Sequence, residues 1–241
     1  MGLTTVLFDL DGTLLPMDQD AFVRSYSSLL IAKAAPHGYV PEKMMAALMH
    51  GITAMVRNDG SCLNEEAFWR SFARDFGEAA LGDKAIFDDF YRNEFEQARV
   101  SCGYDERAAQ VIRLLKEKGY RLVLATNPFF PKAATYARIR WAGLDASDFE
   151  LVTTYDNSRF CKPNPAYYHA IMEELGVTPQ ECMMVGNDVG EDMMTAALGM
   201  QVFLLTPCLI NAVGADTSAY PQGGYDELLA HIRAMDHAAN G

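Results

Sequence analysis

Short apolar runs alternate with longer amphipathic segments over the part of the chain that follows residue 104. The runs have the length of buried strands, and the segments between them have helical periodicity. The predicted strands are 121–125, 149–153, 182–185 and 201–205, and the predicted helices are 105–118, 131–141, 165–175, 190–198 and 225–234. This alternation is typical of a parallel sheet in an α/β fold. The apolar run 4–8 predicts one more strand of that sheet, and 211–224, rich in small residues, predicts a surface excursion.

The segment 16–103 has a different pattern. Its apolar residues recur at intervals of three and four, and none of it is typical of a strand. We therefore predict an α/β core made of 1–15 and 104–241, with 16–103 inserted after the first strand as a helical domain. Its methionines, among them Met45 and Met49, are interpreted as core filler. Pro16 and the segment 101–103 are the two connections and hence candidate hinges.

Two carboxylates, Asp9 and Asp11, follow the first predicted strand, and a turn glycine comes directly after them. As a strand gives way to a turn, two such side chains can converge on one site. Buried acids repel each other and lose solvation unless a cation lies between them. Magnesium is the usual cation of a carboxylate site that also handles phosphate oxygens. A solvated Asx turn is the alternative interpretation, and the residues at the other strand ends argue against it.

Each of the next three strands also ends in polar residues. Thr126 and Asn127 follow the second strand, Lys162 comes after the third across a polar loop, and Gly186-Asn187-Asp188 follows the fourth. Ligands of parallel α/β sheets bind outside the carboxyl ends of the strands. Singly, these residues are ordinary capping and surface groups. In this order, they predict one site for a phosphoryl group.

Four motifs resemble those of the haloacid dehalogenase superfamily of phosphotransferases with a helical (C1-type) cap. They are Phe8-Asp9-Leu10-Asp11-Gly12-Thr13-Leu14, Thr126-Asn127, Lys162-Pro163, and Gly186-Asn187-Asp188 with Asp192. The resemblance implies a Rossmann-like parallel sheet with helices on both faces and a cap that closes over the site. The second acid of the fourth motif is either Asp192 or Glu191. We favour Asp192, because four residues after Asp188 on an opening helix places both acids on one side.

The resemblance also implies roles. Asp9 would be the nucleophile that forms an aspartyl-phosphate, and Asp11 the general acid and base. Mg²⁺ would be held by Asp9, by Asp11 through its backbone carbonyl, and by Asp188. Lys162, Thr126 and Asn127 would bind the phosphoryl group. Asp192 and Asn187 would support these groups from behind, with Asp192 orienting Lys162 or the waters of the metal.

The expected activity is Mg²⁺-dependent hydrolysis of a small phosphomonoester metabolite. Family dehalogenases lack an acid at the position of Asp11, so its presence favours phosphoryl chemistry. A sugar-phosphate mutase needs the same core residues, and a phosphonate hydrolase also needs a cap lysine, for which Lys33 and Lys43 are the candidates. A phospholigand-binding protein without catalysis is a further alternative. The cap residues Arg24, His50, Arg57 and Asn58 are interpreted as surface groups.

Charge and cysteine content set the expected surroundings. The formal charge of −12 argues against a nucleic acid or an anionic membrane as partner. Five scattered cysteines without CxxC spacing are typical of reduced thiols, and no apolar stretch has the length of a membrane span. The first strand begins almost at once, so we expect no leader. We expect a cytoplasmic monomer or weak dimer.

Overall fold

The core is a six-stranded sheet in which every neighbouring pair of strands runs parallel. The computed structural model describes residues 2–238. The strands are β1 (Thr5–Phe8), β2 (Arg121–Leu124), β3 (Leu151–Val152), β4 (Cys182–Gly186), β5 (Gln201–Leu205) and β6 (Gln222–Gly223). Their order in the sheet is β3-β2-β1-β4-β5-β6, so β1 lies between β2 and β4. The predicted α/β fold is confirmed.

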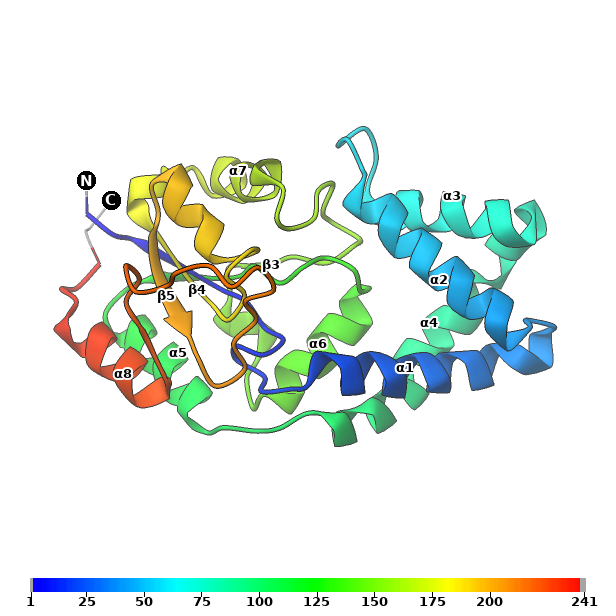
Figure 1. Ribbon diagram of the computed structural model, residues 1–241, viewed down its shortest axis with the longest axis horizontal. Coiled ribbons are helices and arrows are strands. Elements are labelled where there is room, and N and C mark those ends of the chain that lie inside the picture. Colours follow the sequence, from blue (N-terminus) through cyan, green and yellow to red (C-terminus); the bar gives the residue numbers. More distant parts are fainter. Residues whose placement is uncertain (1, 239–241) are drawn as a thin grey trace.

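Helices cover both faces of this sheet (Figure 1). The core helices are α5 (Arg107–Glu117), α6 (Lys132–Trp141), α7 (Pro165–Leu175) and α8 (Tyr225–Ala234). Successive side chains of a strand point to opposite faces. Leu7 of β1 therefore packs in the apolar cluster that contains residues of α7, and Phe8 packs in the cluster that contains residues of α5 and α8. Both faces of the sheet are buried, which explains why the strands are continuously apolar.

Two core segments differ from the prediction. The excursion 211–224 contains β6, whose residues are polar or glycine and pair with β5 only through the backbone, so no side-chain pattern indicates it. The segment 190–198 is not one helix: residues 189–192 form turns, and a 3₁₀ helix follows at Met193–Leu198. The Asp188 carboxylate accepts the backbone N–H groups of Gly190 and Glu191 at 2.7 and 2.9 Å. Such local side-chain hydrogen bonds occur both in turns and at helix N-termini, so Asp188 fits either structure.

Residues 18–101 contain helices and no strand, and this helical segment lies to one side of the sheet (Figure 1). It contains α1 (Gln19–Ala34), α2 (Pro41–Val56), α3 (Asn64–Phe76), α4 (Lys84–Arg92) and a 3₁₀ helix, η3 (Glu94–Ser101). The two connections to the core lie side by side, since Gly103 donates its N–H to the Pro16 carbonyl at 2.7 Å. Their use as hinges, and domain boundaries at 15/16 and 103/104, stay predictions. No helix in residues 2–238 combines the length and apolar character needed to cross a membrane.

A second contact joins the helical segment to the core at the start of α3. The N–H groups of Asn64 and Glu65 donate to the carbonyls of Ser158 and Tyr155 at 2.8 and 3.0 Å. The buried Asn64 side chain also donates to the Phe160 carbonyl at 3.3 Å. The helical segment therefore contacts the core through hydrogen bonds at two separate places.

Phe95 of η3 is the aromatic residue that joins the helical segment to α6. It is fully buried and stacks on Trp141 with ring centroids 5.1 Å apart. We expect Phe95→Ala to lower the free energy of unfolding by about 3–5 kcal/mol, because the truncation leaves a cavity between the two parts. Urea unfolding measures this loss. Val100→Ala, in the same 3₁₀ helix but at an exposed side chain, is the control and should change little. A loss for Phe95→Ala no larger than that of the control would contradict the packing described here.

Candidate active site

The turn after β1 directs Asp9 and Asp11 toward one cavity. Gly12 adopts φ +87°, a conformation that glycine tolerates without strain, and a Cβ at this position would lie 2.4 Å from the side-chain nitrogen of Asn187. Asn187 is buried, and its carbonyl oxygen accepts a hydrogen bond from the Thr13 hydroxyl at 2.9 Å. The turn after β4 thus holds the turn after β1 in place.

Lys162 is the cation at the base of this cavity. Its side chain is fully buried, and its ammonium group donates to Asp9 Oδ1 at 2.8 Å and to Asp192 Oδ1 at 2.7 Å. Burial alone would lower the pKa of Lys162, but the Asp192 and Asp9 carboxylates outweigh it and hold that pKa well above its usual value. Burial also raises the pKa of Asp192 to about 7, against the attraction of Lys162. One oxygen of Asp9 is therefore held from behind, and the other is left for the cavity.

Asp11 has a second buried cation as its partner. Arg138 of α6 is fully buried, lies with its guanidinium carbon 4.3 Å from the centroid of the Phe130 ring, and forms an ion pair with Asp11 Oδ2. Asp11 Oδ1 is buried and has no hydrogen-bond partner within residues 2–238. Burial raises the pKa of Asp11, and the positive charge of Arg138 opposes that rise.

Sequence reasoning did not identify Arg138. The available signal is its spacing, because it lies four residues after Ala134 and three before Trp141, both of which are buried on the core side of α6. An arginine at a core-facing helical position requires an acceptor nearby.

The loop after β2 holds Thr126 and Asn127. The Thr126 carbonyl accepts hydrogen bonds from the hydroxyls of Thr153 and Tyr167, at 2.7 and 2.9 Å, which fixes the backbone here. The Asn127 side-chain nitrogen donates to both carboxylate oxygens of Glu191 at 3.0 Å. That donor is therefore in use, and the predicted phosphoryl contact of Asn127 requires its backbone N–H instead. The N–H groups of Thr126 and Asn127 donate to no oxygen of residues 2–238.

The turn after β4 separates three acids that are close in sequence. Asp192 is buried and faces Lys162, Glu191 faces Asn127, and Asp188 lies at the cavity with one oxygen bonded to backbone N–H groups. Burial raises the pKa of Glu191. The expectation that Asp188 and Asp192 share one side of an opening helix is wrong, because residues 189–192 form turns and the 3₁₀ helix begins only after Asp192, at Met193. The backbone turns, and the Asp188 N–H donates to Asp192 Oδ2 at 3.1 Å.

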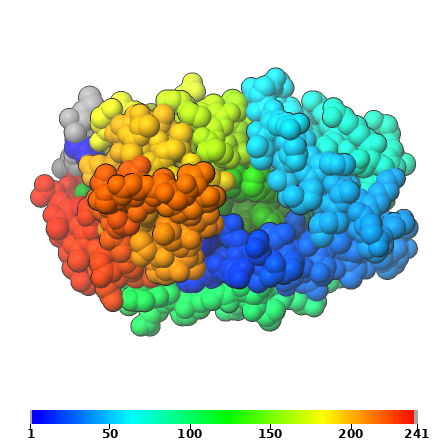
Figure 2. Space-filling view, viewed as in Figure 1, coloured from blue at the N-terminus to red at the C-terminus, as the bar shows by residue number. Residues whose placement is uncertain are grey.

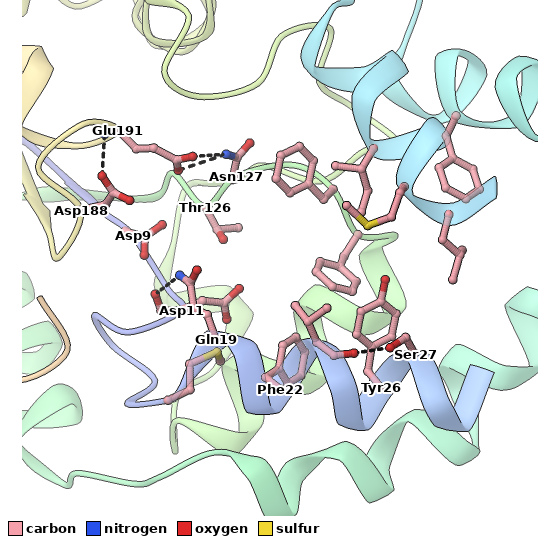
Figure 3. Close-up of a pocket in the computed structure, with 18 of the residues that line it drawn as sticks. Asp9, Asp11, Gln19, Phe22, Tyr26, Ser27, Thr126, Asn127, Asp188 and Glu191 are labelled. Carbon is pink, nitrogen blue, oxygen red and sulfur yellow. Dashed lines mark hydrogen bonds between the residues drawn. The ribbon is translucent and has the colours of Figure 1, made fainter. Parts of the chain in front are cut away.

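The predicted site residues meet around one cavity of about 270 Å³ between the core and the helical segment (Figure 3). Lys162 lies behind the cavity wall, and the others line it: Asp9, Asp11, Thr126, Asn127, Asn187, Asp188 and Asp192. Figure 2 shows the surface hollowed between the blue and cyan helices α1 and α2 and the core. In Figure 3, the acids and amides cluster at one end, and Phe22 and Tyr26 of α1 lie at the other. The four strand ends thus converge as their order in the sequence predicts.

The donors for a divalent cation are the free oxygens of Asp9 and Asp188 and the backbone carbonyl of Asp11. Within residues 2–238, no three His, Cys, Asp or Glu side chains form a ligand cluster. Mg²⁺ needs fewer, since it keeps several waters and binds through one or two carboxylates. The unpartnered buried oxygen of Asp11 adds negative potential at the same place. The residues present therefore fit Mg²⁺.

Removing Asp192 tests the buried ion pairs. We expect Asp192→Ala to lower the free energy of unfolding by about 3 kcal/mol, the low end for a broken buried pair, because Lys162 keeps Asp9 as a partner. Chemical denaturation monitored by circular dichroism measures this. Glu66→Ala, which removes an i,i+4 pair with Arg70 whose side chains are both more than half exposed, should have little effect. Equal losses of unfolding free energy in the two variants would show that the buried pairs of Lys162 with Asp9 and Asp192 do not stabilise the fold.

Comparison with known proteins gives the family. Residues 3–199 match the family described as "Hydrolase: haloacid dehalogenase-like hydrolase". Hexitol phosphatase A of Escherichia coli is 30% identical over 227 residues, which are 93% of this chain and 89% of that protein. A phosphoglycolate phosphatase of Pseudomonas putida is 27% identical over 83% of this chain and 68% of its own length.

Solved structures agree on the fold. The crystal structure of a HAD phosphatase from Thermococcus onnurineus superposes with a TM-score of 0.58 at 19% identity, and the match covers 98% of this chain and 100% of that one. The family match spans most of the chain, and it agrees with the resemblance carried by the four motifs. The chain belongs to the haloacid dehalogenase-like hydrolases.

Proposed function

We propose that this protein is a Mg²⁺-dependent phosphatase that hydrolyses a small phosphomonoester through an aspartyl-phosphate on Asp9. The single observation that carries the proposal is the setting of Asp9. Lys162 holds one of its carboxylate oxygens at 2.8 Å, and the cavity is open to the carboxylate from the other side. A carboxylate that is paired with a cation on one side and open to substrate on the other has the orientation that nucleophilic attack on phosphorus requires.

In the first step, Asp9 forms a bond to phosphorus and the bond from phosphorus to the ester oxygen breaks. Asp11 donates a proton to the departing alkoxide, a role supported by its pKa, which burial raises, so that the acid form is more accessible. In the second step, Asp11 takes a proton from water, which attacks phosphorus and releases Asp9 and inorganic phosphate. Arg138 keeps the Asp11 carboxyl oriented between the two steps.

The phosphoryl oxygens need donors while charge shifts among them. The backbone N–H groups of Thr126 and Asn127 are free for this purpose, and the Thr126 side chain lines the same cavity. Lys162, which lies behind the cavity wall beside Asp9, adds positive charge. Asp9, Asp188 and the Asp11 carbonyl would hold Mg²⁺. Bound there, the cation offsets the repulsion between the dianionic ester and the attacking carboxylate.

The alternatives have less support. A phosphonate hydrolase would need a cap lysine at the site, but Lys33 pairs with Asp89 and Glu94, and Lys43 lies over the Phe76 ring. A sugar-phosphate mutase would use the same core residues, and a non-catalytic binder would have no use for Asp11 beside Asp9. The phosphatase names of the two relatives favour hydrolysis.

The proposed setting is the cytoplasm, with a small phosphorylated metabolite as substrate. All five cysteines are free thiols, which suits a reducing compartment. The predicted monomer or weak dimer stays a prediction.

Hydrolysis of p-nitrophenyl phosphate with Mg²⁺ tests the proposal. We expect Asp9→Asn to abolish turnover, and EDTA to abolish the turnover of the unmodified enzyme until Mg²⁺ is restored, because the attacking anion and the charge that screens it are then missing. Asp75→Asn, at a residue that pairs with His50 and does not line the cavity, is the control and should keep normal rates. Activity that survives in Asp9→Asn would exclude Asp9 as the nucleophile.

A further inference from the structure

We propose that the substrate carries an apolar leaving group, an alkyl or aryl alcohol, rather than a sugar, a polyol or a second anionic group. The inference rests on the proposed function, since it concerns the part of the substrate beyond the phosphorus. It comes from the wall of the cavity opposite the acids. The observations that carry it are the composition of that wall, the exposure of two of its methionines and the size of the space.

The wall opposite Asp9 is almost entirely apolar. Residues of α1, α2, α3, α4 and the loop after β2 form it: Phe22, Val23, Tyr26, Met45, Leu48, Met49, Ile52, Phe68, Tyr91, Phe129 and Phe130. The Ser27 hydroxyl, also at this wall, donates to the Val23 carbonyl of its own helix. Only the hydroxyls of Tyr26 and Tyr91 could replace the hydrogen bonds to water that a hydroxyl-rich leaving group would lose here, so most of that loss would stay uncompensated, which is costly.

No lysine, arginine or histidine lines the cavity among residues 2–238. The four polar cap residues named in the sequence analysis do not supply a charge or a hydrogen-bond donor to the cavity either. Arg24, His50 and Arg57 are exposed and do not line the cavity, and Asn58 is buried in its own loop, where it donates to the Cys62 carbonyl at 2.9 Å. A leaving group with a carboxylate or a second phosphate would therefore face acids at one end and hydrocarbon at the other.

Met45 and Met49 are exposed on this wall, which corrects their interpretation as core filler. Met44 and Met55 of the same helix are fully buried, whereas Met45 is 36% and Met49 is 50% exposed. Both exposed methionines line the cavity, one helical turn apart. Methionine side chains are flexible and polarizable, and they adapt to apolar ligands of varied shape. Their position gives the leaving group a surface on which it can be desolvated.

The space suits a small group. An apolar cavity of about 150 Å³ holds one benzene molecule. The cavity here measures about 270 Å³ and includes the acidic end, so it has room for a phosphoryl group and one ring or short chain beside it. Phenyl, benzyl and alkyl esters of up to about six carbons are the sizes that this comparison favours.

The test measures kcat/KM with Mg²⁺ for ethyl, butyl and hexyl phosphate, with glycerol phosphate and phosphoglycolate as polar esters. Straight-chain alcohols leave with nearly equal reactivity, so chain length changes recognition and not chemistry. We expect kcat/KM to rise roughly four-fold for each added methylene, the effect of burying one such group, and both polar esters to fall below butyl phosphate. A flat series, or a preference for either polar ester, would overturn the inference.

Two variants of α2 test whether the dependence of kcat/KM on chain length arises at the apolar wall. The double variant Met45→Gln/Met49→Gln should flatten the dependence on chain length, because its wall no longer desolvates the chain. Val56→Gln changes an equally exposed apolar residue of α2 outside the cavity and should leave the dependence as it is. Equal behaviour of these two variants would contradict the placement of the leaving group. With p-nitrophenyl phosphate as a generic substrate, turnover combined with a flat series refutes only the inference, and absence of turnover on every ester refutes the proposed function as well.

Discussion

The charge balance of one desolvated pocket is the constraint on which the rest of this structure depends. Five carboxylates line the cavity and two buried cations contact them. The acids are Asp9, Asp11, Asp188, Glu191 and Asp192, and the cations are Lys162 and Arg138. Burial raises the pKa of three of the five carboxyls, those of Asp11, Glu191 and Asp192, and the neighbouring cations oppose that rise. A divalent cation is the simplest way to offset the remaining negative charge before a phosphate dianion enters.

The sheet makes this concentration of charge possible. β1 lies in the middle, with β2 and β4 beside it, so the turns that follow these three strands meet at one edge. Apolar layers on both faces keep the strands in place. The Asn187 side chain packs close to Gly12 and accepts a hydrogen bond from the Thr13 hydroxyl, which joins the turn after β4 to the turn after β1. The core thus presents the acids, and the helical segment supplies most of the apolar wall opposite them.

Much of the site was predictable, because the residues concerned directly follow strands. A strand end can be read locally, and parallel strands bring their ends together whatever the distance in sequence. Arg138 could not be found in this way, since it lies inside a helix and reaches Asp11 across 127 positions. The engagement of Asn127 by Glu191 and the exposure of Met45 depend likewise on packing between separate elements. The turns at 189–192 escaped prediction because an acid that accepts the N–H groups two and three residues later is also typical of a helix N-terminus, so the sequence does not distinguish the two.

Phosphorylation of Asp9 is the step on which the proposed hydrolysis depends. An Asp11→Asn variant mixed with excess p-nitrophenyl phosphate and Mg²⁺ tests it directly, since this leaving group departs without a proton while the second step still needs a base. After acid quenching and proteolysis, mass spectrometry should find one phosphoryl group on the peptide that carries Asp9. Release of p-nitrophenol while this peptide stays unmodified, or a phosphoryl group on another residue, would exclude Asp9 as the nucleophile.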